Sequence, residues 1–88
     1  MILPTVAPYA GANTTALRFG DALTVYFSYS TPVAFMAPGT GIVARINVWG
    51  PTTGKHISEI DGGEYNARLR HDGEMFEEML QEQMHKLP

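Results

Sequence analysis

The chain has 88 residues, no cysteine and a formal net charge of −3. The length is typical of one domain with a small core, and the missing cysteines exclude disulfides and thiolate metal sites. No apolar run approaches the roughly 20 residues that a membrane-spanning helix needs, and the negative charge argues against binding nucleic acid by bulk charge alone.

The first 15 residues, interrupted by Pro4 and Pro8, show no clean period in their apolar side chains. We therefore expect an N-terminal arm over residues 1–15 and a single domain over residues 16–88. The arm is either a loosely ordered terminus or a segment that packs on a neighbouring subunit. The side chains that would make such a contact are Ile2, Leu3, Val6 and Tyr9. No basic residue precedes its apolar part, so we expect no signal peptide and a cytoplasmic location.

The segment Leu23–Tyr29 predicts a half-buried antiparallel strand. Successive side chains of a strand point to opposite faces, and here one face is apolar while the other carries hydroxyl groups. The apolar face holds Leu23, Val25, Phe27 and Tyr29, and the hydroxyl face holds Thr24, Tyr26, Ser28 and Ser30. Leu17–Phe19 predicts a short strand before it. After it, Pro32 breaks the run and Val33 to Phe35 begins the next strand of a hairpin.

The segment Ala37–Gly41 predicts a type II turn, because Pro and Gly stand at its second and third positions. The alternation then resumes over Ile42–Trp49 and predicts another strand. One face of that strand would carry Arg45, Asn47 and Trp49. If the hairpins align, Tyr26 and Ser28 share this face.

The segment Gly50–His56 resembles a phosphate-binding loop but has one residue too few before its Gly-Lys pair and no Ser or Thr after the lysine. We interpret it as the start of a short helix that Thr52 or Thr53 caps and that runs to Ile60, before Asp61-Gly62-Gly63 ends it. A second interpretation stays open, in which the helix N-terminus binds a phosphate or carboxylate. Its ligands would be Thr52, Thr53, Lys55 and His56.

The C-terminal part predicts an amphipathic helix over residues 72–87, preceded by a segment, Glu64–His71, that fits either an edge strand or a turn of helix. Asp72 suits the N-cap and Lys86 suits the last turn. The apolar stripe consists of Met75, Met79, Leu80, Met84 and Leu87, with Phe76 beside it. Such a stripe is core in most proteins, and a dimer or partner face is the alternative because methionine repacks easily.

These elements predict an α+β fold. We expect a small antiparallel sheet of three to five strands, a short helix after Trp49, and the C-terminal helix packed on one face of the sheet.

Catalytic and metal-binding patterns are not found in the sequence. The three histidines, His56, His71 and His85, have no close companion at metal-ligand spacing. No serine stands in a Gly-x-Ser-x-Gly turn and no pair of acids ends a strand. We therefore expect no enzyme activity, no metal and no cofactor.

A longer pattern runs through the middle of the chain, from Thr24 to Gly63. It reads YFSY at 26–29, TPVAF at 31–35, Trp49, TTGKH at 52–56 and Ile60. This pattern resembles a family of small uncharacterised proteins of bacteriophages and mobile elements. The resemblance implies a virus- or element-encoded small protein, and it brings no functional residues with it.

Two functions compete on this evidence. The first is a non-catalytic interaction protein that binds a host protein or itself and forms homo-oligomers. We expect no membrane among its partners. The second is a binder of single-stranded nucleic acid, nucleotide or phosphate, which would stack bases on an aromatic sheet face and hold phosphate at the TTGKH turn. The candidate binding residues are Tyr26, Tyr29, Arg45, Trp49, Thr52, Thr53, Lys55 and His56.

Overall fold

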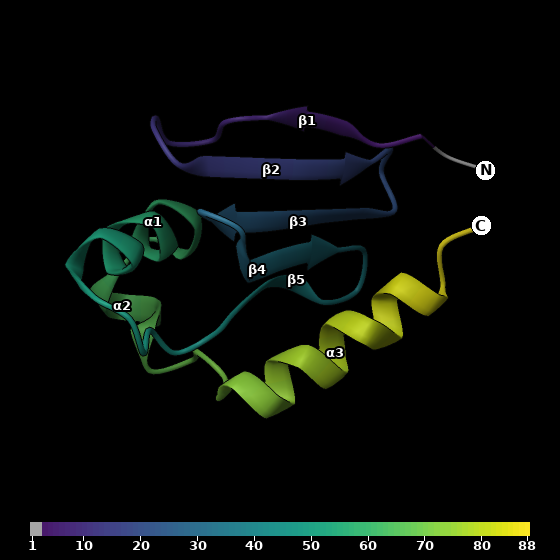
Figure 1. Cartoon of the computed structure of the whole chain (residues 1–88). Coiled ribbons are helices and arrows are strands. Elements are labelled where there is room, and N and C mark those ends of the chain that lie inside the picture. Colours follow the sequence, from purple (N-terminus) through teal and green to yellow (C-terminus); the bar gives the residue numbers. More distant parts are fainter. Residues whose placement is uncertain (1–2) are drawn as a thin grey trace.

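The computed structural model describes residues 3–88, with Glu64 and Tyr65 described by their backbone alone. Five strands form one sheet in sequence order, and every neighbouring pair is antiparallel (Figure 1). The strands are β1 (Thr5–Ala7), β2 (Thr14–Phe19), β3 (Leu23–Ser28), β4 (Thr31–Ala37) and β5 (Gly41–Ala44). The helices are α1 (Pro51–Asp61), α2 (Glu64–Ala67) and α3 (Gly73–His85). The predicted α+β fold, with its C-terminal helix on the sheet, is confirmed.

The segment expected to be an arm contributes a strand to the sheet. Thr5–Ala7 forms β1 and pairs with Ala16–Arg18 of β2. Pro4 and Pro8 bound this strand at its two ends, because proline has no N–H for a ladder. Three residues are too few to show an alternating pattern, which explains why the sequence did not predict the strand. Ile2, one of the expected contact residues, lies outside the described residues.

A row of apolar side chains crosses one face of all five strands. Its members are cross-strand partners in turn: Val6, Leu17, Val25, Phe35 and Val43. Helix α3 covers this face through Phe76, which is fully buried and whose ring centroid lies 5.9 Å from that of Phe35. We name this side of the sheet the α3 face.

The opposite face carries alanines on either side of Tyr26, and we name it the α1 face. Its row of partners is Ala7, Ala16, Tyr26, Ala34 and Ala44. Because alanine lets another element approach closely, α1 packs Ile57 directly onto Ala34 and Ala44. The two helices thus enclose the β3–β5 half of the sheet from both sides.

A turn is present on each side of the strand after Leu23–Tyr29, but Pro32 does not break the run: it lies inside β4 and pairs with Phe27, and Tyr29 leaves the strand for the turn. Tyr29 and Ser30 alone connect β3 to β4, and Tyr29 takes a positive φ of 55°. Gly39 takes a φ of 88°, and Thr40 N–H donates to Ala37 C=O at 3.2 Å. This closes the turn predicted at Ala37–Gly41.

The strand predicted over Ile42–Trp49 stops at Ala44, so the expected shared face of Arg45, Asn47 and Trp49 does not form. Asn47 is the physical reason. Its side-chain amide donates to Gly50 C=O at 2.9 Å and its Oδ1 accepts from Trp49 N–H at 3.0 Å. Asparagine commonly bonds its own backbone in this way, and the resulting turn leads the chain away from the sheet into α1.

The helix ends match the sequence prediction in part. Asp72 caps α3 by accepting from Met75 N–H at 2.9 Å, and Gly62 ends α1 with a φ of 89°. The predicted cap of α1 by Thr52 or Thr53 is wrong. Gly50 holds the N-cap position without a side-chain bond, and Pro51 begins the helix.

The buried face of α3 is centred on Phe76, and not on the methionine stripe that was predicted. Phe76 is the buried anchor, with Met79 and Leu80 beside it, whereas Met75 and Met84 are exposed. The ambiguous segment after α1 begins as the short helix α2. It then returns to the sheet, where His71 bridges Arg45 in parallel. Among the described residues, no helix has the length and apolar character to cross a bilayer.

Candidate functional site

The eight candidate residues fall into separate places in the fold. Tyr26, Thr53 and His56 point into the α1 face, while Arg45 lies on the α3 side against Phe76. The suggestion that Tyr26 and Arg45 share a face is therefore wrong, because the two side chains lie on opposite sides of the sheet. The exposed candidates are Tyr29, Trp49, Thr52 and Lys55.

A buried polar cluster joins the end of β3 to α1. Ser28 Oγ lies 2.7 Å from His56 Nδ1 and 3.0 Å from Thr53 Oγ1. All three side chains are buried, which the sequence did not predict for Thr53 and His56. They are tolerated inside because each satisfies the hydrogen-bonding needs of another.

This cluster fastens a helix to a strand. A serine beside a histidine also occurs at nucleophilic sites, but Ser28 is only 2% exposed, so a substrate has no access to its hydroxyl. Either direction of the hydrogen-bond chain satisfies all three groups, with the imidazole tautomer set accordingly. Sequence reasoning placed Ser28 on the hydroxyl face and missed its partners, because they come from residues 25 and 28 positions further along.

Arg45 and Trp49 form a stacked pair beside the start of α3. The guanidinium carbon lies 4.6 Å from the centroid of the indole and 6.0 Å from that of Phe76. Arg45 Nε is buried without a hydrogen-bond partner among the described residues. A side chain at Gly73 would collide with this guanidinium, so the end of the Arg45 side chain would have to move away from its place beside Trp49. Trp49 itself remains 47% exposed.

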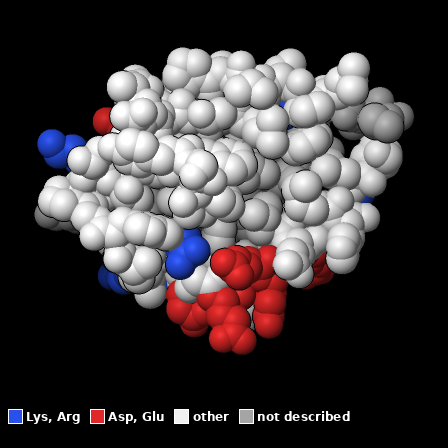
Figure 2. All heavy atoms as spheres, viewed as in Figure 1, with Lys and Arg blue, Asp and Glu red and all other residues white. Residues whose placement is uncertain are grey.

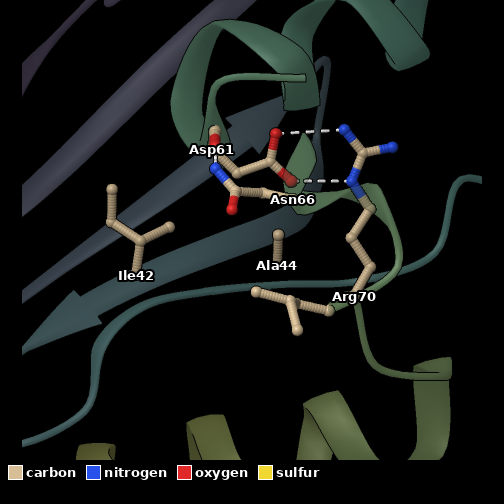
Figure 3. A pocket seen from close by; sticks show the side chains of 6 residues that line it. Ile42, Ala44, Asp61, Asn66 and Arg70 are labelled. Atoms are coloured by element: carbon tan, nitrogen blue, oxygen red, sulfur yellow. Dashed lines mark hydrogen bonds and ion pairs between the residues drawn. The ribbon is translucent and has the colours of Figure 1, made fainter. Parts of the chain in front are cut away.

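A pocket of about 290 Å³ opens between β5, the end of α1 and the segment after α2 (Figure 3). Ile42, Ala44 and Leu69 supply its apolar part. Its polar wall is an ion pair in which Arg70 Nε lies 2.7 Å from Asp61 Oδ2 and Arg70 Nη2 lies 3.0 Å from Oδ1. Burial by itself would raise the pKa of Asp61, but the hydrogen bonds from Arg70 and from Gly63 N–H, with the charge of Arg70, lower it below its ordinary value.

A tyrosine from the loop after β1 packs on the α1 face. The rings of Tyr9 and Tyr26 meet edge to face at 5.3 Å, and Tyr9 O–H donates to Phe27 C=O at 3.0 Å. Burial, together with the nearby Tyr26, raises the pKa of Tyr9 to about 12.

The α3 face has a partly uncovered region at β1, at β2 and at the Phe27 end of β3. A shallow groove of about 320 Å³ lies there, and we name it the β1–β3 groove. It is lined by Val6, Thr15, Leu17, Phe27, Tyr29 and Ser30. Val6 is 66% exposed at the open edge of the sheet. The groove is the uncovered end of the apolar row that α3 covers elsewhere.

Charge is distributed unevenly over the molecule. The acidic side chains of α3 gather at the bottom of the view in Figure 2, and the top, where Figure 1 places β1 and β2, shows almost no charged atoms. The sequence agrees, since its first charged residue is Arg18. Among the described residues, no three His, Asp or Glu side chains meet as a metal ligand set would.

The fold and these surfaces define a small α+β protein, a five-stranded antiparallel meander with one helix on each face. Its family is established by comparison with known proteins. Residues 4–78 match the model of a family of unknown function, DUF8033, and the chain belongs to that family. The match begins at β1 and ends within α3. No curated protein and no solved structure was found to be similar to the chain.

Proposed function

We propose that this protein is a non-catalytic interaction protein that binds a protein partner, either a host factor or a copy of itself, through the β1–β3 groove. The observation that carries the proposal is the uncovered end of the apolar row, where Leu17 packs at the margin of the core and Val6 continues the row into solvent. Contiguous apolar surface of this kind on a small monomer marks interaction sites.

The backbone of Tyr29 supports the same proposal. This residue lines the groove, is 56% exposed and has a φ of 55°. An ordinary side chain in the left-handed region costs about 1–2 kcal/mol. The ring lies 6.1 Å from that of His56, centroid to centroid, and its exposed remainder offers aromatic surface to a partner.

The setting of the protein is part of the proposal. The pattern of residues 26–60 supports an origin in a bacteriophage or mobile element, and with it a place in the cytoplasm of the host cell. Self-association is the form of partner binding developed below.

The test compares two valines of matched exposure. Val6 is 66% exposed and Val48 is 67% exposed, and only Val6 lines the groove. We expect Val6→Asp to abolish binding of the partner in a quantitative capture assay with purified tagged protein. Val48→Asp should bind as the wild type does. Equal binding by both variants would contradict the proposal.

Tyr29→Gly separates function from stability. Glycine adopts a positive φ without strain, which offsets the lost contact with the His56 ring, so we expect the free energy of unfolding to change by less than about 1 kcal/mol. Partner binding should weaken because the aromatic surface is gone. A variant that binds as tightly as the wild type would remove Tyr29 from the contact.

The second candidate function, binding of single-stranded nucleic acid, has one observation in its favour. The indole of Trp49 is half exposed and carries the Arg45 guanidinium 4.6 Å from its centroid, an arrangement on which a base could stack. The net charge of −3 weighs against it. Quenching of Trp49 fluorescence by a short oligonucleotide at low salt, reversed by added salt and lost in Lys55→Glu, would favour this function over the first.

A further inference from the structure

We propose that β1 pairs with the β1 of a second copy, antiparallel and centred on Val6, so that two molecules share one continuous sheet. This inference rests on the proposed function, and it names the partner and the contact. The argument comes from the hydrogen-bond directions, the two prolines, the charge distribution and the apolar row.

The hydrogen-bond directions follow from one observed bond. Tyr29 N–H donates to Asn13 C=O at 2.8 Å, next to the pair formed by Thr14 and Ser28. Because such pairs alternate along antiparallel strands, the backbone groups of Ala16 and Arg18 point away from β3 and toward β1. Their partners Ala7 and Thr5 therefore bond to β2, and the N–H and C=O of Val6 point outward from the edge.

The two prolines fix one register for pairing along this edge. Pro4 and Pro8 stand two residues on either side of Val6, so their backbone positions face the same outward side. Neither has an N–H to donate. A shift of the second copy by two residues would place Val6 opposite a proline and lose a donor. Only the symmetric register lets both copies of Val6 exchange N–H···O=C bonds.

The charge distribution permits this contact. Residues 1–17 carry no charged side chain, so the pairing brings no like charges together. Figures 1 and 2 place β1 at the top of the molecule and the acidic side chains of α3 at the bottom, so the acidic surfaces of two paired copies lie far apart. Natural sheet edges are protected by short strands, prolines or charged side chains. This edge is short and bounded by prolines, which confine pairing to Val6, and it carries no charge.

The other edge of the sheet is bridged at the end of β5 by the segment after α2. His71 N–H donates to Ala44 C=O at 2.9 Å, and Ile46 N–H donates to His71 C=O at 2.8 Å. Because the β1–β1 contact uses the same surface of both copies, it forms a closed pair with two-fold symmetry and not a filament.

The apolar row supplies the buried surface that two hydrogen bonds alone would not. In the pair, the two Val6 side chains meet at the two-fold axis with Leu17 of each copy behind them, and the apolar rows of the two molecules become one. The two β1–β3 grooves then lie side by side on the same face.

The first experiment uses the absence of cysteine from the chain. In a hydrogen-bonded antiparallel pair the two Cα atoms lie about 5.5 Å apart, within the range of a disulfide. We expect Val6→Cys to form a covalent dimer under mild oxidation. Its yield should not fall on dilution as long as the protein concentration stays above the dissociation constant of the dimer. Val48→Cys, of matched exposure, should cross-link only by collision and lose yield on dilution. Equal behaviour of the two variants would overturn the inference.

The second experiment removes the central donor without touching the fold. Because the N–H of Val6 points outward, Val6→Pro keeps every bond between β1 and β2. We expect light scattering to give twice the 9.7 kDa chain mass for the wild type and for the control Val6→Thr, and the chain mass itself for Val6→Pro. A monomeric wild type at high micromolar concentration would overturn the inference.

These outcomes are distinguishable from failure of the proposed function. If the wild type is monomeric but Val6→Asp still abolishes binding of a different protein, the proposal that the partner is a second copy is wrong. The proposal that the groove is an interaction surface is then supported. If the groove variants change neither self-association nor capture, both proposals fail.

Discussion

Single residues in this protein satisfy one another in pairs and triads, and Ser28 is the clearest case. Its hydroxyl is the common partner of Thr53 and His56. Removing it leaves two buried polar groups short of a hydrogen bond, which costs about 1–3 kcal/mol. We expect Ser28→Ala to lower the free energy of unfolding by that amount in urea denaturation. Ser30→Ala, at an exposed position of the adjoining turn, should change it by less than about 0.5 kcal/mol.

The raised pKa of Tyr9 predicts how the stability of the fold changes at alkaline pH. Its pKa is raised from 10.0 to about 12 by burial and by Tyr26. The folded state therefore holds this proton more tightly than the unfolded chain does. The resulting stability is complete below pH 10 and is lost as the pH rises through about 12. A spectrophotometric titration should show one tyrosine ionising late, and the late step should disappear in Tyr9→Phe.

At the scale of elements, the Asp61–Arg70 ion pair connects the end of α1 to the segment that returns to β5. Both side chains are nearly buried, and breaking such a pair by removing one charge costs about 3 kcal/mol. We expect Asp61→Asn to lose that stability near neutral pH. Glu59→Gln, at an exposed position of the same helix, should not.

The loss of stability caused by Asp61→Asn should depend on pH. The pKa of Asp61 is lowered in the folded state, so its contribution is complete above the ordinary value of 3.8 and is lost as the pH falls through the lower folded value. The difference between wild type and Asp61→Asn should therefore shrink in acid. A difference that stays constant from neutral pH to strong acid would show that packing, and not charge, is responsible.

The elements that the sequence predicted well are those with local signals. The strand at Leu23–Ser28, the Pro-Gly turn and the Asp72 cap each depend on neighbouring residues, and all three are present. The expected exposed hydroxyl face of that strand is wrong, because Thr24 and Ser28 are buried. β1 was missed because three residues carry no period. The strand after Gly41 was drawn too long because the turn at Asn47 competes with its alternation.

The candidate site was less predictable because its partners are distant in sequence. Thr53 and His56 look like surface groups until Ser28 is placed beside them, 25 and 28 residues away. Arg45 and Tyr26 were expected on a common face. However, β5 ends at Ala44, before Arg45, and the two side chains lie on opposite sides of the sheet. The groove at β1 could have been expected from Val6 only if the strand itself had been recognised.

At the scale of the whole molecule, charge and apolar surface lie on opposite sides. The molecule measures 37 × 26 × 19 Å, more than the Debye length of about 10 Å at 0.1 M salt. The acidic surface of α3 should therefore contribute little to pairing through β1. We expect the dissociation constant of the dimer to change by no more than about threefold between 50 and 500 mM salt. A steep salt dependence, measured by sedimentation, would indicate a contact that involves α3 instead.

The meander order of the sheet has a consequence for how the chain folds. Every strand pairs with its immediate neighbour in sequence, so each hairpin closes a short loop at low entropic cost. The longer closures, such as Ser28 to His56 and Ala44 to His71, belong to the helices and to the segment between them. Contacts between residues close in sequence favour rapid folding, and in this protein the sheet itself is made of such contacts. The strands thus provide a folding nucleus onto which α1 and α3 dock, and mutations in the hairpins should slow folding while mutations at the helix contacts should mainly speed unfolding.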